Sequence, residues 1–187
     1  MSAFSALSPV NRDVRAAAAL CLTILVGSEH ALAQAAPDWR AWDMLVGEWI
    51  ADEGRGQPGT ATTASFSFSF DLDRHVLIRR DHSEYAATGD RPATRHDGLM
   101  IVYADRPGRF AAASFDNEGH VIEYAVEIAS PARIVFTSAV QPGQPRYRLT
   151  YDAIGPGVKI TFAIAPPDKP DAFAVYVEGT AHRARRP

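Results

Sequence analysis

Two polar side chains that alternate with apolar ones in a strand-like stretch are the first candidates for chemistry. Arg80 and His82 have the same two-residue period as Val76 and Ile78. Alternate residues of a β-strand point to one face, so all four point inward if the two aliphatic residues do. An inward arginine must find a carboxylate, a hydroxyl or a ligand anion, because an unpaired buried charge is very costly. The alternative is that Arg80 and His82 lie beyond the rim of the fold, in solvent.

A third candidate, His120, follows the turn-forming stretch 116–119. It shares its predicted strand face with Ile122 and Tyr124, so it either points into the interior or caps the turn. Histidine is the natural acid–base group at neutral pH. Arg80, His82 and His120 could therefore orient a ligand, or catalyse a hydrolysis or an isomerisation inside a cavity.

No residue spacing in the chain identifies a defined reaction. The sequence has no H-E-x-x-H, no G-x-S-x-G, no phosphate-binding loop and no dinucleotide fingerprint. His82, Glu84 and His96 have no spacing that supports a metal site, and we expect none. His96 and Asp97 alternate to opposite strand faces and are not expected to act as a dyad. Whether the protein is an enzyme stays open at this point.

The elements that must position these residues are short β-strands. From 63 to 70, three phenylalanines alternate with three serines, which is the pattern of a half-buried strand and excludes an amphipathic helix. Similar runs cover 75–85, 95–104, 109–115, 122–128, 134–140, 147–151, 158–164 and 173–177. Glycine, proline, asparagine and aspartate separate the runs and no helical pattern lies between them, which predicts an antiparallel meander of about ten strands.

A meander of this length has two open edges, and closure into an up-and-down barrel removes both of them. A two-sheet sandwich is the alternative, but the short turns leave few candidates for Greek-key crossovers. Residues 37–44 predict one or two helical turns before the first strand. We therefore expect an all-β fold, a single antiparallel barrel with a short N-terminal helix.

Residues 1–33 have the layout of a secretory signal peptide. Arg12 and Arg15 precede the apolar run 16–27, and Ala31-Leu32-Ala33 forms a cleavage site. The run is shorter than the about 20 residues that span a bilayer; a buried helix or an uncleaved anchor are the alternatives. The barrel domain would then span 34–187, without the only cysteine, Cys21, and without a transmembrane segment. This predicts a periplasmic or extracellular protein.

The formal charge of the chain, −3, favours some classes of partner over others. Phosphate binding needs clustered lysine and arginine, so we expect no nucleic acid as a partner. A small-molecule ligand is the expected partner, and the protein is expected to be a monomer or a homodimer.

The stretch Leu45-Val46-Gly47-Glu48-Trp49, placed before so many strands, resembles the opening of calycin-type barrels. It is similar to the L-x-G-x-W opening of nitrobindin-type barrels, distantly also to fatty-acid-binding-type barrels, and the whole chain looks most like bacterial lipocalin-like proteins. The resemblance implies that Trp49 plugs the closed end of a barrel, with an arginine stacked over it. Arg183 and Arg185, after the last strand, are the candidates for this arginine.

The resemblance to nitrobindin-type barrels also raises the question of haem, which a late histidine ligates in that family. His182 is late in this chain, but residues 178–181 before it do not reproduce the family's pattern. Haem binding is therefore an alternative, and no cofactor is the leading expectation.

These observations together predict an exported barrel that binds a small, mainly apolar or amphipathic ligand. Arg80, His82 and His120 would supply the few polar contacts of the pocket. The apolar lining would consist of Phe66, Phe68, Phe70, Ile101, Tyr103, Ile122, Tyr124, Phe136 and Phe162. The alternatives are a cavity enzyme, a haem protein, and an envelope interaction protein whose aromatic residues simply fill the core.

Overall fold

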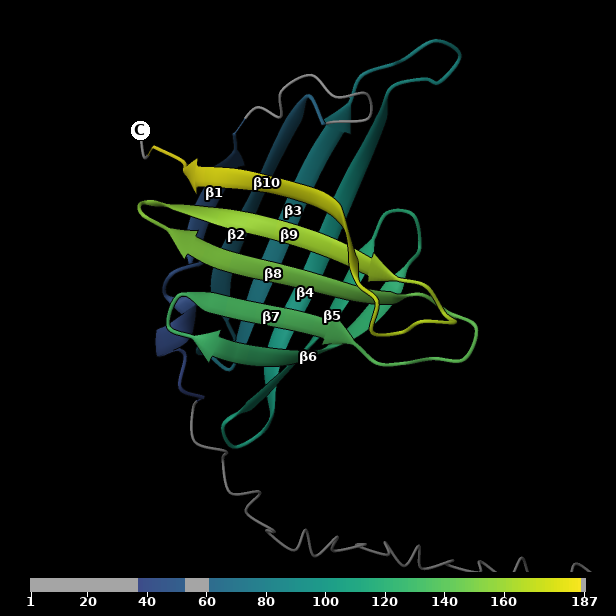
Figure 1. The fold of residues 1–187 in the computed structure, drawn as a ribbon. Helices are drawn as coiled ribbons and strands as arrows, with labels where there is room; N and C mark the ends of the chain where they lie inside the picture. Colours follow the sequence, from purple (N-terminus) through teal and green to yellow (C-terminus); the bar gives the residue numbers. More distant parts are fainter. Residues whose placement is uncertain (1–36, 53–60, 186–187) are drawn as a thin grey trace, which may run out of the picture. The chain divides into compact units, whose positions relative to one another are not determined.

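Ten antiparallel strands form a closed barrel (Figure 1). The structure is a computed structural model and describes residues 37–52 and 61–185, so the predicted signal peptide lies outside the described residues. The elements are η1 (Arg40–Trp42), β1 (Gly47–Ala51), β2 (Thr63–Asp71), β3 (Val76–Tyr85), β4 (Thr94–Arg106), β5 (Arg109–Asp116), β6 (Val121–Ser130), β7 (Arg133–Ser138), β8 (Arg146–Ile154), β9 (Gly157–Ala165) and β10 (Ala174–Arg183). This confirms the predicted all-β fold and the barrel over the sandwich.

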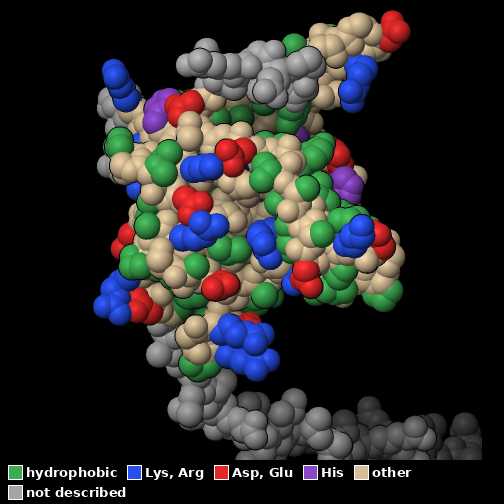
Figure 2. Space-filling view, viewed as in Figure 1, with side chains coloured by type: hydrophobic (Ala, Val, Ile, Leu, Met, Phe, Trp, Pro, Cys, Tyr) green, Lys and Arg blue, Asp and Glu red, His purple; other side chains and the backbone are tan. Residues whose placement is uncertain are grey.

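Each strand pairs with its neighbours in sequence, and the pairing of β1 with β10 closes the ring. In Figure 1 the strands β6 to β10 cross steeply in front of β2 to β5, so the barrel is flattened into two walls. Acidic and basic side chains are interspersed on the face seen in Figure 2, in keeping with the small net charge. The ring leaves no strand edge unpaired, which is the physical reason for closure.

The predicted N-terminal helix is only one 3₁₀ turn, Arg40–Trp42. Its segment covers one end of the barrel, because Trp39, Trp42 and Leu45 are buried there. Trp39 packs on Phe110 at a centroid distance of 4.8 Å. The turn thus closes the barrel end with indole rings. Among the described residues no helix is long and apolar enough to cross a membrane.

The Gly-x-Trp stretch fixes how the two terminal strands meet. Trp49 is opposite Arg183 in the β1–β10 pairing, and its indole nitrogen donates to the carbonyl of Leu45 at 2.7 Å. Gly47 has a φ of 124°, and a Cβ there would lie 2.7 Å from Nη1 of Arg183. Glycine is therefore required twice, for its backbone conformation and for the close approach of the guanidinium.

Candidate ligand site

The barrel interior holds a large cluster of aromatic side chains. Phe66, Phe68, Tyr124 and Phe136 are buried in it, as the alternation predicted. Tyr151 lies between the two walls, with its ring 5.5 Å from that of Phe68. The other predicted lining residues that face inward, Phe70, Ile122 and Phe162, are partly buried and pack against this cluster.

The predicted inward orientation of Arg80 and His82 is wrong. Arg80 pairs with Ser67 on β2 and Leu99 on β4, whereas the neighbouring Arg79 pairs with the buried Phe68 and Met100. Cross-strand partners share a face, so Arg80 points outward. His82 also points outward, and its Nδ1 lies 2.6 Å from Oδ1 of Asp97. This contact raises the pKa of His82, with Glu84 adding to the effect.

The same correction applies to Ile101 and Tyr103 on β4. They lie on the outer face, whereas Met100 and Val102, which alternate with them along the strand, are buried. The orientation predicted for Ile101 and Tyr103 is wrong because β4 carries apolar residues on both faces. The two-residue period therefore locates the strand but does not show which of its faces is inside. One residue of register reverses every side chain of a strand, and β3 and β4 were assigned to the wrong face together.

The inward charged residues of β3 are Arg79 and Asp81, which sequence reasoning missed. Their side chains are only 15% and 12% exposed and form an ion pair. The guanidinium carbon of Arg79 is 5.7 Å from the Phe66 ring centroid. A signal was available: Arg79 and Asp81 are opposite charges two residues apart, on the same face as Leu77, and such a pair can neutralise itself inside a fold.

Two polar groups beside this ion pair lack partners. Nε of Arg79 and the hydroxyl of Tyr151 are both buried without a hydrogen bond among the described residues. Burial raises the pKa of Tyr151 to about 12, with Arg79 acting in the opposite direction, so the hydroxyl keeps its proton at neutral pH. Burial acts to lower the pKa of Arg79, but Tyr151 and Asp81 outweigh it and raise that pKa. The interior therefore presents a guanidinium and a phenol that act on each other, with Nε of Arg79 left as a donor without a partner among the described residues.

Gly98 on β4 makes room for the ion pair. It lies opposite Asp81 in the β3–β4 pairing, and a Cβ at this position would be 2.8 Å from Cγ of Asp81. A side chain of any kind would push the carboxylate off the β4 backbone. The small residue thus positions Asp81, which in turn holds Arg79.

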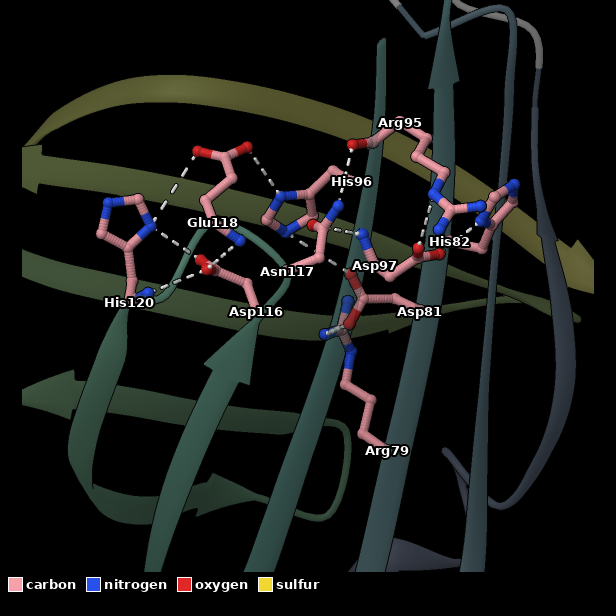
Figure 3. A network of polar contacts seen from close by, with 10 residues as sticks. All are labelled: Arg79, Asp81, His82, Arg95, His96, Asp97, Asp116, Asn117, Glu118 and His120. Atoms are coloured by element: carbon pink, nitrogen blue, oxygen red, sulfur yellow. Dashed lines mark hydrogen bonds and ion pairs between the residues drawn. The ribbon is translucent and has the colours of Figure 1, made fainter.

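A chain of polar contacts leads from this ion pair to the rim of the barrel, where β3 to β6 end (Figure 3). Nε2 of His96 is 4.0 Å from Oδ2 of Asp81, and its Nδ1 is 3.3 Å from Oε1 of Glu118. Glu118 also lies 3.9 Å from Nδ1 of His120. His96 is thus the histidine nearest to the interior.

His120 lies at the rim, with its side chain 62% exposed. Both its backbone N–H and its ring contact Asp116, at 2.9 and 2.8 Å. Burial acts to raise the pKa of Asp116, but the hydrogen bonds from His120 and Glu118 lower it. His120 therefore caps the turn, and with His82 on the outer surface the histidines considered for a cavity enzyme are not brought together.

His182 faces outward and does not fit a haem ligand inside the barrel. Its Nδ1 contacts Oδ1 of Asp52 at 2.6 Å, and the neighbouring Ala181 is the buried residue. Hydrogen bonds from Thr180 and His182 lower the pKa of Asp52. Among the described residues, no three histidines, cysteines or carboxylates are placed to hold a metal ion.

Of the two late arginines, Arg183 stacks over Trp49, with its guanidinium carbon 4.5 Å from the ring centroid. It also donates to the carbonyl of Val46 at 2.5 Å. Arg185 lies beyond β10 and is exposed. Arg183 thus fastens the segment before β1 to the last strand.

The end of the barrel opposite Trp39 and Trp42 has an apolar wall that remains accessible. Val177 is opposite Phe162 on the inner face, yet it is 56% exposed. Tyr147 stacks on Phe162 with a centroid distance of 5.9 Å. Small inward residues, among them Gly98 and Gly179, line the strands nearby. An apolar wall thus meets a polar rim at this end.

The fold and the site together define a closed ten-stranded antiparallel barrel with a buried aromatic cluster, consistent with a calycin-type barrel. Neither a known protein family nor a curated protein matches this sequence.

Proposed function

We propose that this barrel binds a small, mainly apolar ligand that carries an acidic head group. The observation that carries the proposal is that Nε of Arg79 and the hydroxyl of Tyr151 are buried beside Asp81 and have no hydrogen bond of standard geometry among the described residues. Buried donors that lack partners cost about 1–3 kcal/mol each, and a carboxylate oxygen placed between them removes that cost. Hydrogen bonds to a charged acceptor are also about twice as strong as neutral ones.

The surroundings of these donors suit the rest of such a ligand. Phe66, Phe68 and Tyr124 provide an apolar environment next to Arg79. Val177 and Phe162 form an accessible apolar surface at the end that the Trp39 and Trp42 rings do not cover. Small-molecule pockets typically combine a mostly apolar lining with a few polar groups that orient the ligand, and Arg79 takes the part that had been expected of Arg80.

Binding of dansyl-undecanoic acid and of its uncharged methyl ester, followed by dansyl fluorescence, tests the proposal. The acid is expected to bind the unaltered protein about tenfold or more tightly than the ester. The double variant R79M/D81N removes both charges without leaving one of them unpaired. It is expected to bind acid and ester equally.

The matched control is R95M/D97N, which removes an ion pair of the same spacing on the outer face of β4. The Arg95 and Asp97 side chains are 3.2 Å apart and well exposed, so the preference for the acid should survive their loss. Equal binding of acid and ester by the unaltered protein would contradict the proposal. So would a preference for the acid that persists in R79M/D81N.

A further inference from the structure

The outer face of β3 to β6 carries an apolar patch that no other element of the described residues covers. Apolar side chains on neighbouring strands of this face lie opposite one another. Leu99 is opposite Phe115, and Phe115 is opposite Val121. Phe115 and Tyr103 are 39% exposed and Val121 is 63% exposed. We call this patch the β3–β6 face; its large side chains are Ile78, Leu99, Ile101, Tyr103, Phe115 and Val121.

The β3–β6 face differs from the neighbouring outer surface of the barrel. The outward residues of β2 are Ser65, Ser67 and Ser69, and on β9 and β10 the outward Lys159 and Glu178 form an ion pair. One face of an antiparallel sheet is normally solvated and polar. A contiguous exposed apolar patch marks an interaction site, and this one spans four strands; exposed apolar residues also lie on β10, at Val175 and Tyr176.

Two opposite charges flank the β3–β6 face at its two sides. Arg80 lies on β3 in the row of Leu99, and Glu123 lies on β6 beside Val121. Neither forms an ion pair within the described part of the chain. Three strand spacings separate β3 from β6, about 14 Å, so the two side chains cannot reach each other within one molecule.

We propose that the β3–β6 face is the interface between two copies of this chain. A twofold interface is self-complementary. If the twofold axis lies in the interface, parallel to the strands, β3 of one copy lies over β6 of the other. Arg80 then meets Glu123 of the partner subunit, and the same contact forms twice. A shallow hollow of about 290 Å³, lined by Arg80, Leu99 and Phe115 among others, gives room for a side chain of the second copy.

The size of the patch sets the strength of the expected dimer. Four strands about 4.8 Å apart and five residues of about 3.3 Å each give roughly 300 Å² of sheet. Stable interfaces bury about 800 Å² on each partner. The patch is well below that size, so the expected association is weak and reversible.

Sedimentation velocity of the purified protein between about 1 and 500 µM tests this proposal. Single charge reversals, Arg80→Glu or Glu123→Arg, are expected to weaken the dimer about tenfold or more, because like charges then oppose each other. The double reversal R80E/E123R is expected to restore it to near the original Kd. The control is Arg91→Glu, on the exposed loop between β3 and β4. It makes the same change in net charge as Arg80→Glu and should leave the dimer intact.

Several results would overturn the proposal. A monomer over the whole concentration range is one, and a dimer that Arg80→Glu leaves unchanged is another. A double reversal weaker than both single reversals would also overturn the proposed pairing. If the protein stays monomeric and cosediments with phosphatidylcholine vesicles, the face contacts a lipid surface and not a second copy. The interface lies on the opposite side of the strands from Arg79, so it stands or falls separately from ligand binding.

Discussion

The substitution Gly47→Ala tests the physical reading of the Gly-x-Trp stretch most directly. Gly47 combines a φ of 124° with a position where a Cβ would lie 2.7 Å from Nη1 of Arg183. That guanidinium group stacks over Trp49 and donates to the carbonyl of Val46. An alanine at 47 therefore strains the backbone and also displaces the arginine.

The two effects have separate magnitudes. A side chain at a positive φ costs about 1–2 kcal/mol. Loss of a hydrogen bond from a charged donor costs about 1.5–3 kcal/mol, and because Arg183 is exposed we take the lower end. The free energy of unfolding should fall by about 3 kcal/mol, a large share of the about 5–15 kcal/mol of a typical domain.

Urea unfolding followed by tryptophan fluorescence measures this loss, with Gly119→Ala as the matched control. Gly119 has a φ of 90° and nothing within 4 Å of a Cβ, so its substitution carries only the backbone cost of about 1–2 kcal/mol. In an Arg183→Met background, Gly47→Ala should cost about as much as Gly119→Ala, since the obstructing group is gone. Equal losses for Gly47→Ala and Gly119→Ala in the unaltered protein would refute the reasoning.

The remaining predictions concern the interior and one surface pair. Phe68→Ala, at a side chain 1% exposed, should lower the free energy of unfolding by about 3–5 kcal/mol in urea titrations; a loss below 1 kcal/mol would mean that the cluster is not tightly packed. Arg79→Met alone should destabilise the protein more than R79M/D81N does, because it leaves Asp81 buried without its partner; the reverse order in thermal unfolding would contradict this. The pKa of His82 is raised above 6.5 and that of Asp97 is lowered below 3.8, chiefly by their mutual hydrogen bond. The contribution of His82 to the free energy of unfolding is complete below its unfolded pKa and is lost as the pH rises through its raised folded pKa. The contribution of Asp97 is lost as the pH falls through its lowered folded pKa. The stability difference between the unaltered protein and His82→Gln should thus be greatest between about pH 4 and 6.5, and a difference that grows towards pH 9 would contradict the assignment.

Strand positions and closure were predictable because they depend on local patterns. The alternation of Phe66, Phe68 and Phe70 with serines has only one apolar face, so β2 could be oriented as well as located. The turns contain glycine and proline, which break a strand for reasons of backbone geometry. A chain of consecutive strands with short turns then has few arrangements other than a closed ring.

The polar part of the candidate site was predictable only from the opposite charges of Arg79 and Asp81, because β3 and β4 are apolar on both faces. Ile78 and Leu77 are neighbours on opposite faces of β3, and the apolar pattern alone does not say which of them meets the core. The strand order decides it, since Leu77 pairs with Phe70 and Val102 on the inner side. The same strands supply the apolar outer patch for which we propose a second copy.

The sequence by itself determined the strands, their order and the closed barrel, because period-two alternation and turn residues act over a few neighbouring positions. It also marked Trp49 and Gly47, whose roles follow from the bulk of an indole and the absence of a Cβ. Only the tertiary structure decided that Arg79, and not Arg80, lies inside with Asp81, Gly98 and the Tyr151 hydroxyl. Those groups come from β3, β4 and the distant β8, and the face on which each lies depends on the register of the whole ring.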